Sequence, residues 1–177
     1  MIAVISDSHI PGRAAGIPEE FVKTLKESDI IVHCGDFETE EIYQKLRQYG
    51  KVIAVKGNCE RFDLPKYEKF EEDDLEFGVT HGTGINPRGH RPTLANIADQ
   101  MDVQVLLHGH THQQEAVKEE GKILLNPGSC TGVGGGSSVP GNPKMMIVET
   151  GLELEVCMIE LENGEFNIDT KEFQIKN

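Results

Sequence analysis

Short apolar runs alternate with amphipathic segments along the first half of the chain. The apolar runs cover residues 2–5, 30–32, 52–55, 75–79 and 103–107. Between them, apolar residues repeat at helical spacing after Pro18, over residues 42–49 and after Pro92. Proline suits a first helical position, where its missing N–H costs little, so both prolines are expected to open helices. Strands that alternate with helices predict an α/β fold with a mostly parallel sheet.

After Gln113 the pattern predicts strands alone, in an antiparallel arrangement, at residues 115–118, 123–125, 145–148, 152–161 and 166–173. The acidic stretch from Glu68 to Glu76 lacks the spacing of a calcium-binding loop and is predicted to be a solvated hairpin. Residues 132–141 are rich in Gly and Ser and lack a phosphate-binding Gly-Lys-Ser/Thr motif. This segment is predicted to be a mobile surface loop, with a lid over a nearby site as the alternative.

The length and charge of the chain limit the number of domains and the kinds of partner that we expect. A chain of 177 residues is close to one domain, so we expect a single domain over residues 1–177. Thirty acidic residues against 17 basic ones give a formal net charge of -13. This charge disfavours broad binding of nucleic acid or of an anionic membrane surface. It still permits a small anionic substrate that meets a local positive charge.

The cysteines and the N-terminus indicate a compartment. The four cysteines are far apart and form no CxxC pair, so we expect reduced thiols rather than a zinc knuckle. The first residues lack the basic region of a signal peptide and reach the charged Asp7 early. Both features predict a cytoplasmic protein. The sequence leaves open a homodimer or a higher homo-oligomer.

Each of the five apolar runs in the first half leads to a residue that can bind a metal, namely Asp7, Asp36, Asn58, His81 and His110. In open α/β sheets, ligands gather at the carboxyl ends of the strands, so these residues are expected to converge. His9 and His112 lie two residues beyond Asp7 and His110 and can join them. Each residue alone has an ordinary explanation as a helix cap, a turn residue or a structural histidine. Their joint arrangement predicts one metal-binding cluster.

The donor set indicates which metals it would hold. Two carboxylates, one amide and four imidazoles suit Mn²⁺, Fe²⁺, Ni²⁺ or Zn²⁺ better than calcium. Seven ligands exceed one tetrahedral site and fit two ions that share a carboxylate. We therefore expect two divalent ions, with Mn²⁺ first and Ni²⁺, Fe²⁺, Zn²⁺ or Mg²⁺ as alternatives.

These residues carry a resemblance to a known family. The ordered blocks are Asp7-Ser8-His9, Gly35-Asp36, Gly57-Asn58-Cys59-Glu60, His81 and Gly109-His110-Thr111-His112. Together they resemble the calcineurin-like metallophosphoesterase superfamily. A further block, Asn126-Pro127-Gly128-Ser129, is similar to one found in its small YfcE-like bacterial and archaeal phosphodiesterases. The resemblance implies a single-domain, four-layer α/β/β/α sandwich.

The resemblance also implies roles for the residues. One metal would be bound by Asp7, His9, Asp36 and His112, and the other by Asp36, Asn58, His81 and His110. Asp36 would bridge the two ions together with a hydroxide. The predicted catalytic residues are Asp36, Asn58, Cys59 and His81.

Cys59 departs from the family pattern, because many members have a histidine after the Gly-Asn pair. A thiol ordinarily has a pKa about two units above that of an imidazole, so Cys59 is a weaker general acid near neutral pH. The sequence therefore predicts a preference for leaving groups that need little protonation. Glu60, which can support that histidine in the family, has an open role here, and a surface carboxylate is the alternative. Asn126 is expected to orient a metal ligand.

Basic residues near the cluster are candidates for binding substrate. Arg88, His90 and Arg91 follow His81, and Arg13 lies in the first loop. Their side chains could hold a substrate phosphate at the mouth of the site. A solvated basic loop before a helix is the equally simple alternative.

The predicted function is that of a metal-dependent phosphoesterase, and phosphodiesterase activity is the favoured form. A hydroxide between two ions would attack a small phosphate ester in line and expel the alcohol. The alternatives are a phosphomonoesterase and a non-catalytic binding scaffold that resembles the retromer subunit of this fold. All seven ligand positions are filled, which favours the enzyme.

Overall fold

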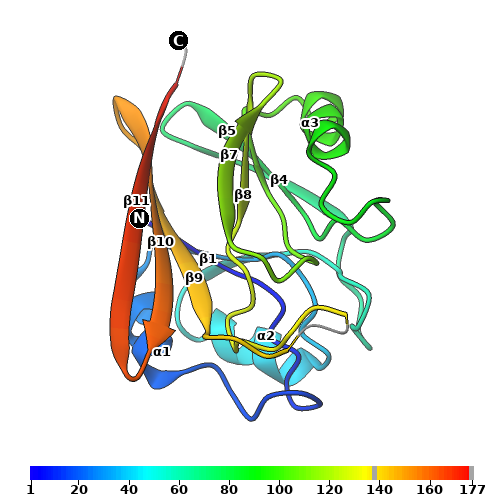
Figure 1. Ribbon diagram of the computed structural model, residues 1–177, viewed down its shortest axis with the longest axis vertical. Coiled ribbons are helices and arrows are strands. Elements are labelled where there is room, and N and C mark those ends of the chain that lie inside the picture. The colour runs from blue at the N-terminus through cyan, green and yellow to red at the C-terminus, as the bar shows by residue number, and fades with distance from the viewer. Residues whose placement is uncertain (137–138, 176–177) are drawn as a thin grey trace.

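The structure is a computed structural model that describes residues 1–136 and 139–175. Its first sheet contains β1 (Ile2–Ile5), β2 (Ile30–His33), β3 (Lys51–Ala54), β9 (Lys144–Glu149), β10 (Glu153–Glu162) and β11 (Glu165–Gln174). The second sheet contains β4 (Tyr67–Glu72), β5 (Leu75–Thr80), β6 (Val105–Leu107), β7 (Glu115–Glu119) and β8 (Lys122–Asn126). The helices in the described residues are α1 (Glu19–Glu27), α2 (Glu40–Arg47) and α3 (Arg91–Gln100) (Figure 1).

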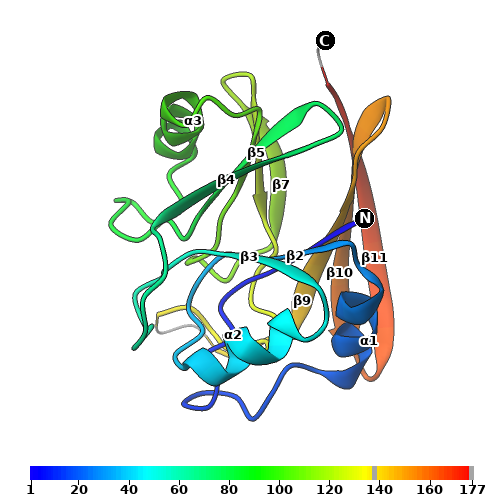
Figure 2. The same ribbon diagram turned by 180° about the vertical axis from the view of Figure 1, so that it is seen from behind.

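The two sheets pack face to face, with helices on both outer sides (Figure 2). Strand β1 shows why, because its four residues are all buried. Ile2 and Val4 join the core between the sheets, whereas Ala3 and Ile5 pack under α1 and α2. A separate cluster lies between α3 and the second sheet. The predicted four-layer α/β/β/α sandwich is confirmed.

The first sheet combines parallel and antiparallel parts. Its order is β11-β10-β9-β1-β2-β3, in which β1, β2 and β3 are parallel as the sequence pattern predicts. Strand β9 then pairs antiparallel with β1 and extends the sheet into the β10–β11 hairpin. The strands from the second half of the sequence are thus divided between both sheets.

The second sheet corrects one expectation. Its order is β4-β5-β6-β8-β7, and β8 runs parallel to β6. The second half of the chain is therefore not wholly antiparallel, because β8 follows β7 through a hairpin and takes its other partner from the tertiary packing. The hairpin predicted at Glu68–Glu76 is confirmed as β4 and β5, with Asp73 and Asp74 at positive φ in its turn.

The three helices lie where the pattern predicts them, but α2 covers Glu40–Arg47 rather than residues 42–49, and α1 begins one residue after its proline. Pro18 precedes α1 as its N-cap residue, whereas Pro92 occupies the first turn of α3. Phe21 and Leu25 are the buried residues of α1. In the described residues, each helix is too short or too polar to cross a membrane.

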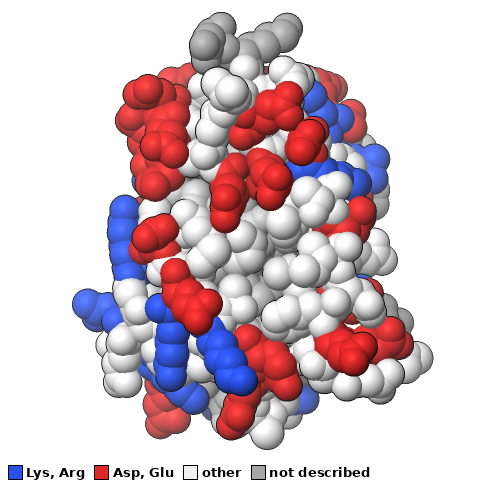
Figure 3. All heavy atoms as spheres, turned by 90° about the vertical axis from the view of Figure 1, so that its left-hand side faces the viewer, with Lys and Arg blue, Asp and Glu red and all other residues white. Residues whose placement is uncertain are grey.

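Acidic side chains are numerous on the face where β10 and β11 form a long hairpin, with Lys and Arg side chains among them (Figure 3). Strand β10 carries four glutamates, and β11 carries three acidic residues and a single lysine. These side chains are mostly exposed or half-buried. Much of the net charge therefore lies on a surface outside the loops at the strand ends, which carry the predicted metal ligands.

Candidate metal centre

The predicted ligands lie in loops at the carboxyl ends of parallel strands. Asp7 and His9 follow β1, and Asp36 follows β2. His110 and His112 follow β6, and thus come from the other sheet. The backbone N–H of His110 donates to Asp7 Oδ2 over 3.1 Å, across 103 residues of sequence. The two sheets therefore contribute to one site.

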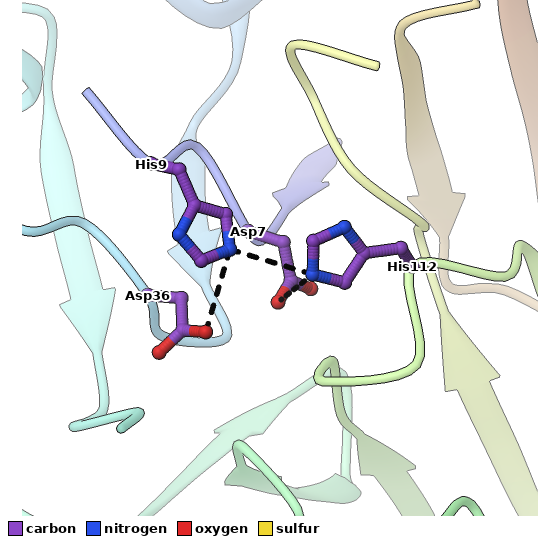
Figure 4. Close-up of side chains that lie close together, drawn as sticks. All are labelled: Asp7, His9, Asp36 and His112. Carbon is purple, nitrogen blue, oxygen red and sulfur yellow. Dashed lines mark hydrogen bonds and ion pairs between the residues drawn. The ribbon is translucent and has the colours of Figure 1, made fainter. Parts of the chain in front are cut away.

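We call Asp7, His9, Asp36 and His112 the first half of the centre. One ligand atom from each lies within 4.8 Å of the others (Figure 4). His112 Nε2 is 3.2 Å from Asp7 Oδ1, and His9 Nε2 is 3.5 Å from Asp36 Oδ2. The two imidazole nitrogens, Nε2 of His9 and Nε2 of His112, are 3.4 Å apart. All four side chains are nearly inaccessible to solvent.

A cation fits this arrangement. Asp7 Oδ1 and His9 Nδ1 are buried and make no hydrogen bond within the described part of the chain. A buried polar atom without a partner costs free energy, so such atoms usually meet an ion or a water molecule. Two carboxylates and two imidazoles whose donor atoms converge are suited to a divalent transition metal.

Backbone carbonyls orient two of the rings. The Nδ1 of His112 donates to the carbonyl of Val133 over 2.6 Å, and the Nδ1 of His81 donates to the carbonyl of Cys34 over 2.7 Å. Each bond requires the hydrogen on Nδ1 and leaves the lone pair of Nε2 directed into the site. Metal-binding histidines are commonly held in this way by a carbonyl on their other nitrogen.

We call Asn58, His81 and His110 the second half of the centre. His81 Nε2 lies 3.4 Å from Asp36 Oδ2 and 3.2 Å from His110 Nδ1. Asp36 Oδ2 therefore lies between His9 of the first half and His81 of the second. Asn58 contacts Asp36 through its backbone N–H, at 2.7 Å from Oδ1, while its exposed side-chain amide donates to Cys59 Sγ.

The electrostatics favour ionised carboxylates beside imidazoles. Burial opposes ionisation of Asp36, but the hydrogen bond and charge of His81, the N–H of Asn58 and the charge of His9 together outweigh burial and lower the pKa of the Asp36 carboxyl. Burial likewise opposes ionisation of Asp7, and His112 and His81 lower its pKa. Burial, followed by the charges of His81 and Arg88, lowers the pKa of His110 to about 4. Near neutral pH the site thus presents two carboxylates and a neutral His110, a form that can bind metal.

Most of the ligand residues have an unusual backbone. Asp7, His9, Asp36, His110 and His112 all have positive φ, between 46° and 71°. This left-handed conformation is uncommon for residues other than glycine and is found mainly where the surrounding structure holds it. Five of the seven residues of the proposed centre therefore have a backbone conformation that the surrounding structure must hold.

Two glycines allow the loops to approach closely. A Cβ at Gly57 would lie 2.2 Å from Asp36 Oδ1, and a Cβ at Gly109 would lie 2.1 Å from Ser6 Oγ. Any larger residue at either position would displace a loop that carries a ligand. Gly57 and Gly109 therefore lie where backbone must come close to a neighbouring loop, which a residue without a side chain allows.

Glu60 and Asn126 hold the ligand loops. The carboxylate of Glu60 accepts hydrogen bonds from the backbone N–H groups of Asp36, Phe37 and Gly57, and so ties the loop after β2 to the loop after β3. The Asn126 amide donates to the carbonyl of Gly109 over 3.0 Å, next to His110. Glu60 is thus a half-buried link between two loops rather than a free surface carboxylate.

Cys59 contacts the carboxylate of Asp36 through its backbone. Its backbone N–H donates to Asp36 Oδ1 over 3.1 Å, and its side chain is partly buried. Burial, with the nearby charge of Asp36, raises the pKa of the thiol to about 12. The side chain is therefore a neutral thiol at ordinary pH, which disfavours a thiolate nucleophile.

The four predicted substrate-binding residues are engaged in different ways. Arg13 donates to the carbonyl of Gly134 over 2.6 Å, and Arg88 donates to the carbonyl of His110. Arg91 forms a two-point ion pair with the carboxylate of Glu115. His90 is the N-cap residue of α3 and contacts Thr93 through its ring. Arg13 and Arg88 thus reach the ligand loops, whereas Arg91 already has an acidic partner, and the substrate role of all four stays a prediction.

The Gly/Ser segment is less detached than its composition suggests. Residues 132–134 are buried, and the carbonyls of Val133 and Gly134 bind His112 and Arg13. The expectation of a mobile surface loop is therefore wrong for this part, because hydrogen bonds to the site hold it. The alternative role as a lid falls partly on residues 137–138, which lie outside the described residues.

Two further supports were not identified from the sequence. Glu38 Oε1 lies 3.7 Å from His9 Nδ1, and its other oxygen accepts the N–H of Gly12. The Thr131 hydroxyl donates to the carbonyl of Ser8 over 3.0 Å. Neither residue carries a local motif, and only the chain's path brings them to the site.

Known proteins show the same sequence and fold features. Residues 1–151 match the model of the calcineurin-like phosphoesterase superfamily domain. A probable metallophosphoesterase of Methanocaldococcus jannaschii is 38% identical over 92% of this chain and 82% of its own length. Another, from Methanothermobacter thermautotrophicus, is 37% identical over 74% of this chain and 77% of its own length.

A solved structure extends the match to three dimensions. Vps29 from Entamoeba histolytica, complexed with Zn²⁺, is 31% identical and superposes with a TM-score of 0.88 over 98% of this chain and 99% of that one. The family match covers the strand-end loops from Asp7 to His112, where the carboxylates and imidazoles converge. The chain therefore belongs to the calcineurin-like phosphoesterase superfamily.

Proposed function

We propose that the protein is a metal-dependent phosphodiesterase that binds two divalent ions, with Mn²⁺ as the preferred metal. The observation that carries this proposal is the position of Asp36 Oδ2, which lies 3.5 Å from His9 Nε2 and 3.4 Å from His81 Nε2. A carboxylate oxygen between two sets of imidazoles is suited to bridge two ions. The first half would hold one ion, and the second half, with Asp36, would hold the other.

The chain's own residues position the ions and the substrate. When bound, the ions supply an acidified water near neutral pH and positive charge for the phosphoryl oxygens. Asp7 and Asp36 carry the negative charge that retains the ions, and the carbonyls of Val133 and Cys34 fix two imidazoles toward them. Arg13 and Arg88 add positive charge at the ligand loops, where a phosphate ester would approach.

Cys59 supports a preference among substrates. Its thiol pKa near 12 makes it a poor proton donor to a departing alcohol, since general acids work best with a pKa near the operating pH. Esters whose leaving groups are stable as anions need no such donor. We therefore propose activated or acidic alcohols as leaving groups, and phosphodiesters ahead of phosphomonoesters.

Chromogenic phosphodiesters and phosphomonoesters test this function in the presence of Mn²⁺, Ni²⁺ or Mg²⁺. We expect wild-type protein to hydrolyse bis(p-nitrophenyl) phosphate faster than p-nitrophenyl phosphate. Asp36→Asn should lower kcat about 10³-fold, because the shared carboxylate loses its charge. Asp169→Asn, at an exposed position of β11, is the matched control and should retain activity.

Three results would change the conclusion. Faster hydrolysis of the monoester would assign a phosphomonoesterase. Hydrolysis that is independent of metal would exclude the proposed centre. No hydrolysis with any of the three ions would favour the non-catalytic scaffold, which the fold similarity to Vps29 keeps as the second candidate.

A further inference from the structure

A cavity of about 170 Å³ lies directly beside the second half of the metal centre. It opens between the ends of β3 and β5 and the start of β4, and its walls are Lys56, Gly57, Lys66, Tyr67 and residues 80–83. His81 belongs to both the cavity and the metal centre, and Gly57 contacts Asp36 on its other side. The cavity therefore shares a wall with the second half of the centre.

The cavity is positively charged within an acidic protein. Lys56 and Lys66 line it, and its described lining residues include no carboxylate. Lys56 Nζ is 3.9 Å from Asp63, but that carboxylate is fully exposed, so the pair contributes little. Lys66 makes no ion pair with the described residues. Both ammonium groups are thus available to a ligand. In a protein with a net charge of -13, two such lysines in one cavity form a local positive site.

The backbone fixes the two lysines relative to each other. The N–H of Lys56 donates to the carbonyl of Pro65 over 2.7 Å, and Pro65 directly precedes Lys66. Lys56 follows β3 of the first sheet, and Lys66 leads into β4 of the second. A short backbone contact therefore closes the cavity wall across the two sheets and keeps the backbones of the two lysines close together.

The size and donors of the cavity indicate what it holds. Pockets for drug-sized ligands usually measure roughly 300–1,000 Å³, whereas a water molecule occupies about 30 Å³. A cavity of about 170 Å³ therefore accepts one small group rather than a whole substrate. Two ammonium groups match a dianion, and the hydroxyls of Thr83 and Tyr67 add hydrogen-bond donors.

Building on the phosphodiesterase function proposed above, we propose that this cavity binds a second phosphoryl group of the substrate. The reacting phosphodiester lies at the metal centre, and the second group lies between Lys56 and Lys66. The preferred substrate class is then a small phosphodiester that carries an additional terminal phosphate. Lys56 and Lys66 determine this specificity without contacting the reacting atoms.

A matched pair of substrates tests the proposal. Ethyl p-nitrophenyl phosphate and 2-phosphonoethyl p-nitrophenyl phosphate release the same chromophore and differ in one non-hydrolysable dianion. In the wild type we expect the phosphonate compound to have a KM about tenfold lower. In Lys56→Gln/Lys66→Gln this ratio of KM values should fall to about one. Lys118→Gln, an exposed lysine of β7 outside the cavity, should keep the wild-type ratio.

The outcomes separate this inference from the proposed function. Wild-type hydrolysis of both esters with equal KM would overturn the second phosphoryl site and leave the phosphodiesterase standing. A tenfold ratio that persists in the double variant would also overturn it, because the dianion would then bind elsewhere. Hydrolysis of neither ester would refute the phosphodiesterase itself, and the inference with it. Circular dichroism of the double variant confirms that it is folded.

Discussion

The two halves of the metal centre are built differently. In the first half, buried side chains approach one another directly, and two of their polar atoms have no hydrogen-bond partner among the described residues. In the second half, Asn58 is exposed and contacts Asp36 through its backbone, and His110 is only partly buried. The difference indicates that the first half is already arranged for a cation, whereas the second half is less enclosed. We therefore expect the first half to bind its ion more tightly.

The largest expected effect comes from removing one histidine in each half. His112→Ala should abolish the tighter metal site and lower kcat about 10³-fold, because a ligand to the buried ion is lost. His110→Ala should weaken only the other site and retain one tightly bound ion per chain. Metal content after dialysis and calorimetric titration with Mn²⁺ measure both. Equal loss of metal in the two variants would show that the halves do not differ.

A substitution at Cys59 tests whether this position, next to the second half, takes part in proton transfer to the leaving group. Cys59→His should raise the turnover of diesters with poor leaving groups by about 10²-fold, because an imidazole is a better proton donor near neutral pH. Diesters with p-nitrophenol as leaving group should change much less. The measurement is the slope of log kcat against the pKa of the leaving group. Cys59→Ser, which lacks the imidazole, should leave the slope as in the wild type, and an unchanged slope in Cys59→His would remove this position from proton transfer.

Glu60 tests whether the second half depends on its backbone support. Glu60→Gln weakens the link from the loop after β2 to the loop after β3 and should lower metal affinity in the second half by about 10- to 100-fold. Of the first half, Glu60 holds only Asp36, whereas His112 and the loop that carries Asp7 and His9 have other contacts, so the affinity of the first half should fall less. Titration with Mn²⁺ separates the two affinities. A loss confined to the first half would contradict the role of Glu60. Glu162→Gln in β10 serves as the surface control.

The smallest expected effect concerns His33, which lies beneath the first half. Its Nε2 contacts Ser8 Oγ and its Nδ1 accepts the N–H of Gly35, and burial lowers its pKa from 6.5 to about 3. The unfolded chain binds a proton here below about pH 6.5, but the folded protein does so only below about pH 3. Unfolding therefore takes up a proton within this window, and stability falls as the pH falls.

The expected slope from this single group is at most about 1.4 kcal/mol per pH unit. Urea unfolding of metal-free protein between pH 6.5 and pH 4 measures it. His33→Gln should reduce the slope, and the exposed His90→Gln should not. Stability that rises as the pH falls, or an equal slope in His33→Gln, would exclude this histidine as the cause.

Local features of the sequence predicted an α/β fold with a mostly parallel sheet, whereas the four-layer sandwich was implied by the resemblance to the family. Apolar runs of strand length and helical repeats are visible without tertiary information, because side chains alternate or repeat along each element. The same runs located Asp7, Asp36 and His110, since parallel strands end at one edge of a sheet. The parallel pairing of β8 with β6 was missed because the partner of a strand depends on packing between distant segments.

The loop chemistry was harder to predict. The Gly/Ser composition of residues 132–141 suggested mobility, but the carbonyl of Val133 is fixed by the ring of His112, 21 residues away. Glu38 carries no motif and reaches His9 only through the fold. A Gly/Ser-rich composition indicates a backbone with high conformational freedom. Hydrogen bonds to residues distant in the sequence can restrict that freedom.

The sequence alone determined which residues can bind a metal and which predicted strand each of them follows. Only the tertiary structure decided that Asp36 Oδ2 lies between His9 and His81, that five ligand residues adopt positive φ, and that Lys56 and Lys66 line one cavity. The physical reason is the range of the interactions. Periodicity acts over a few residues, whereas the site is closed by contacts such as the hydrogen bond from His110 to Asp7, which joins two sheets across 103 residues.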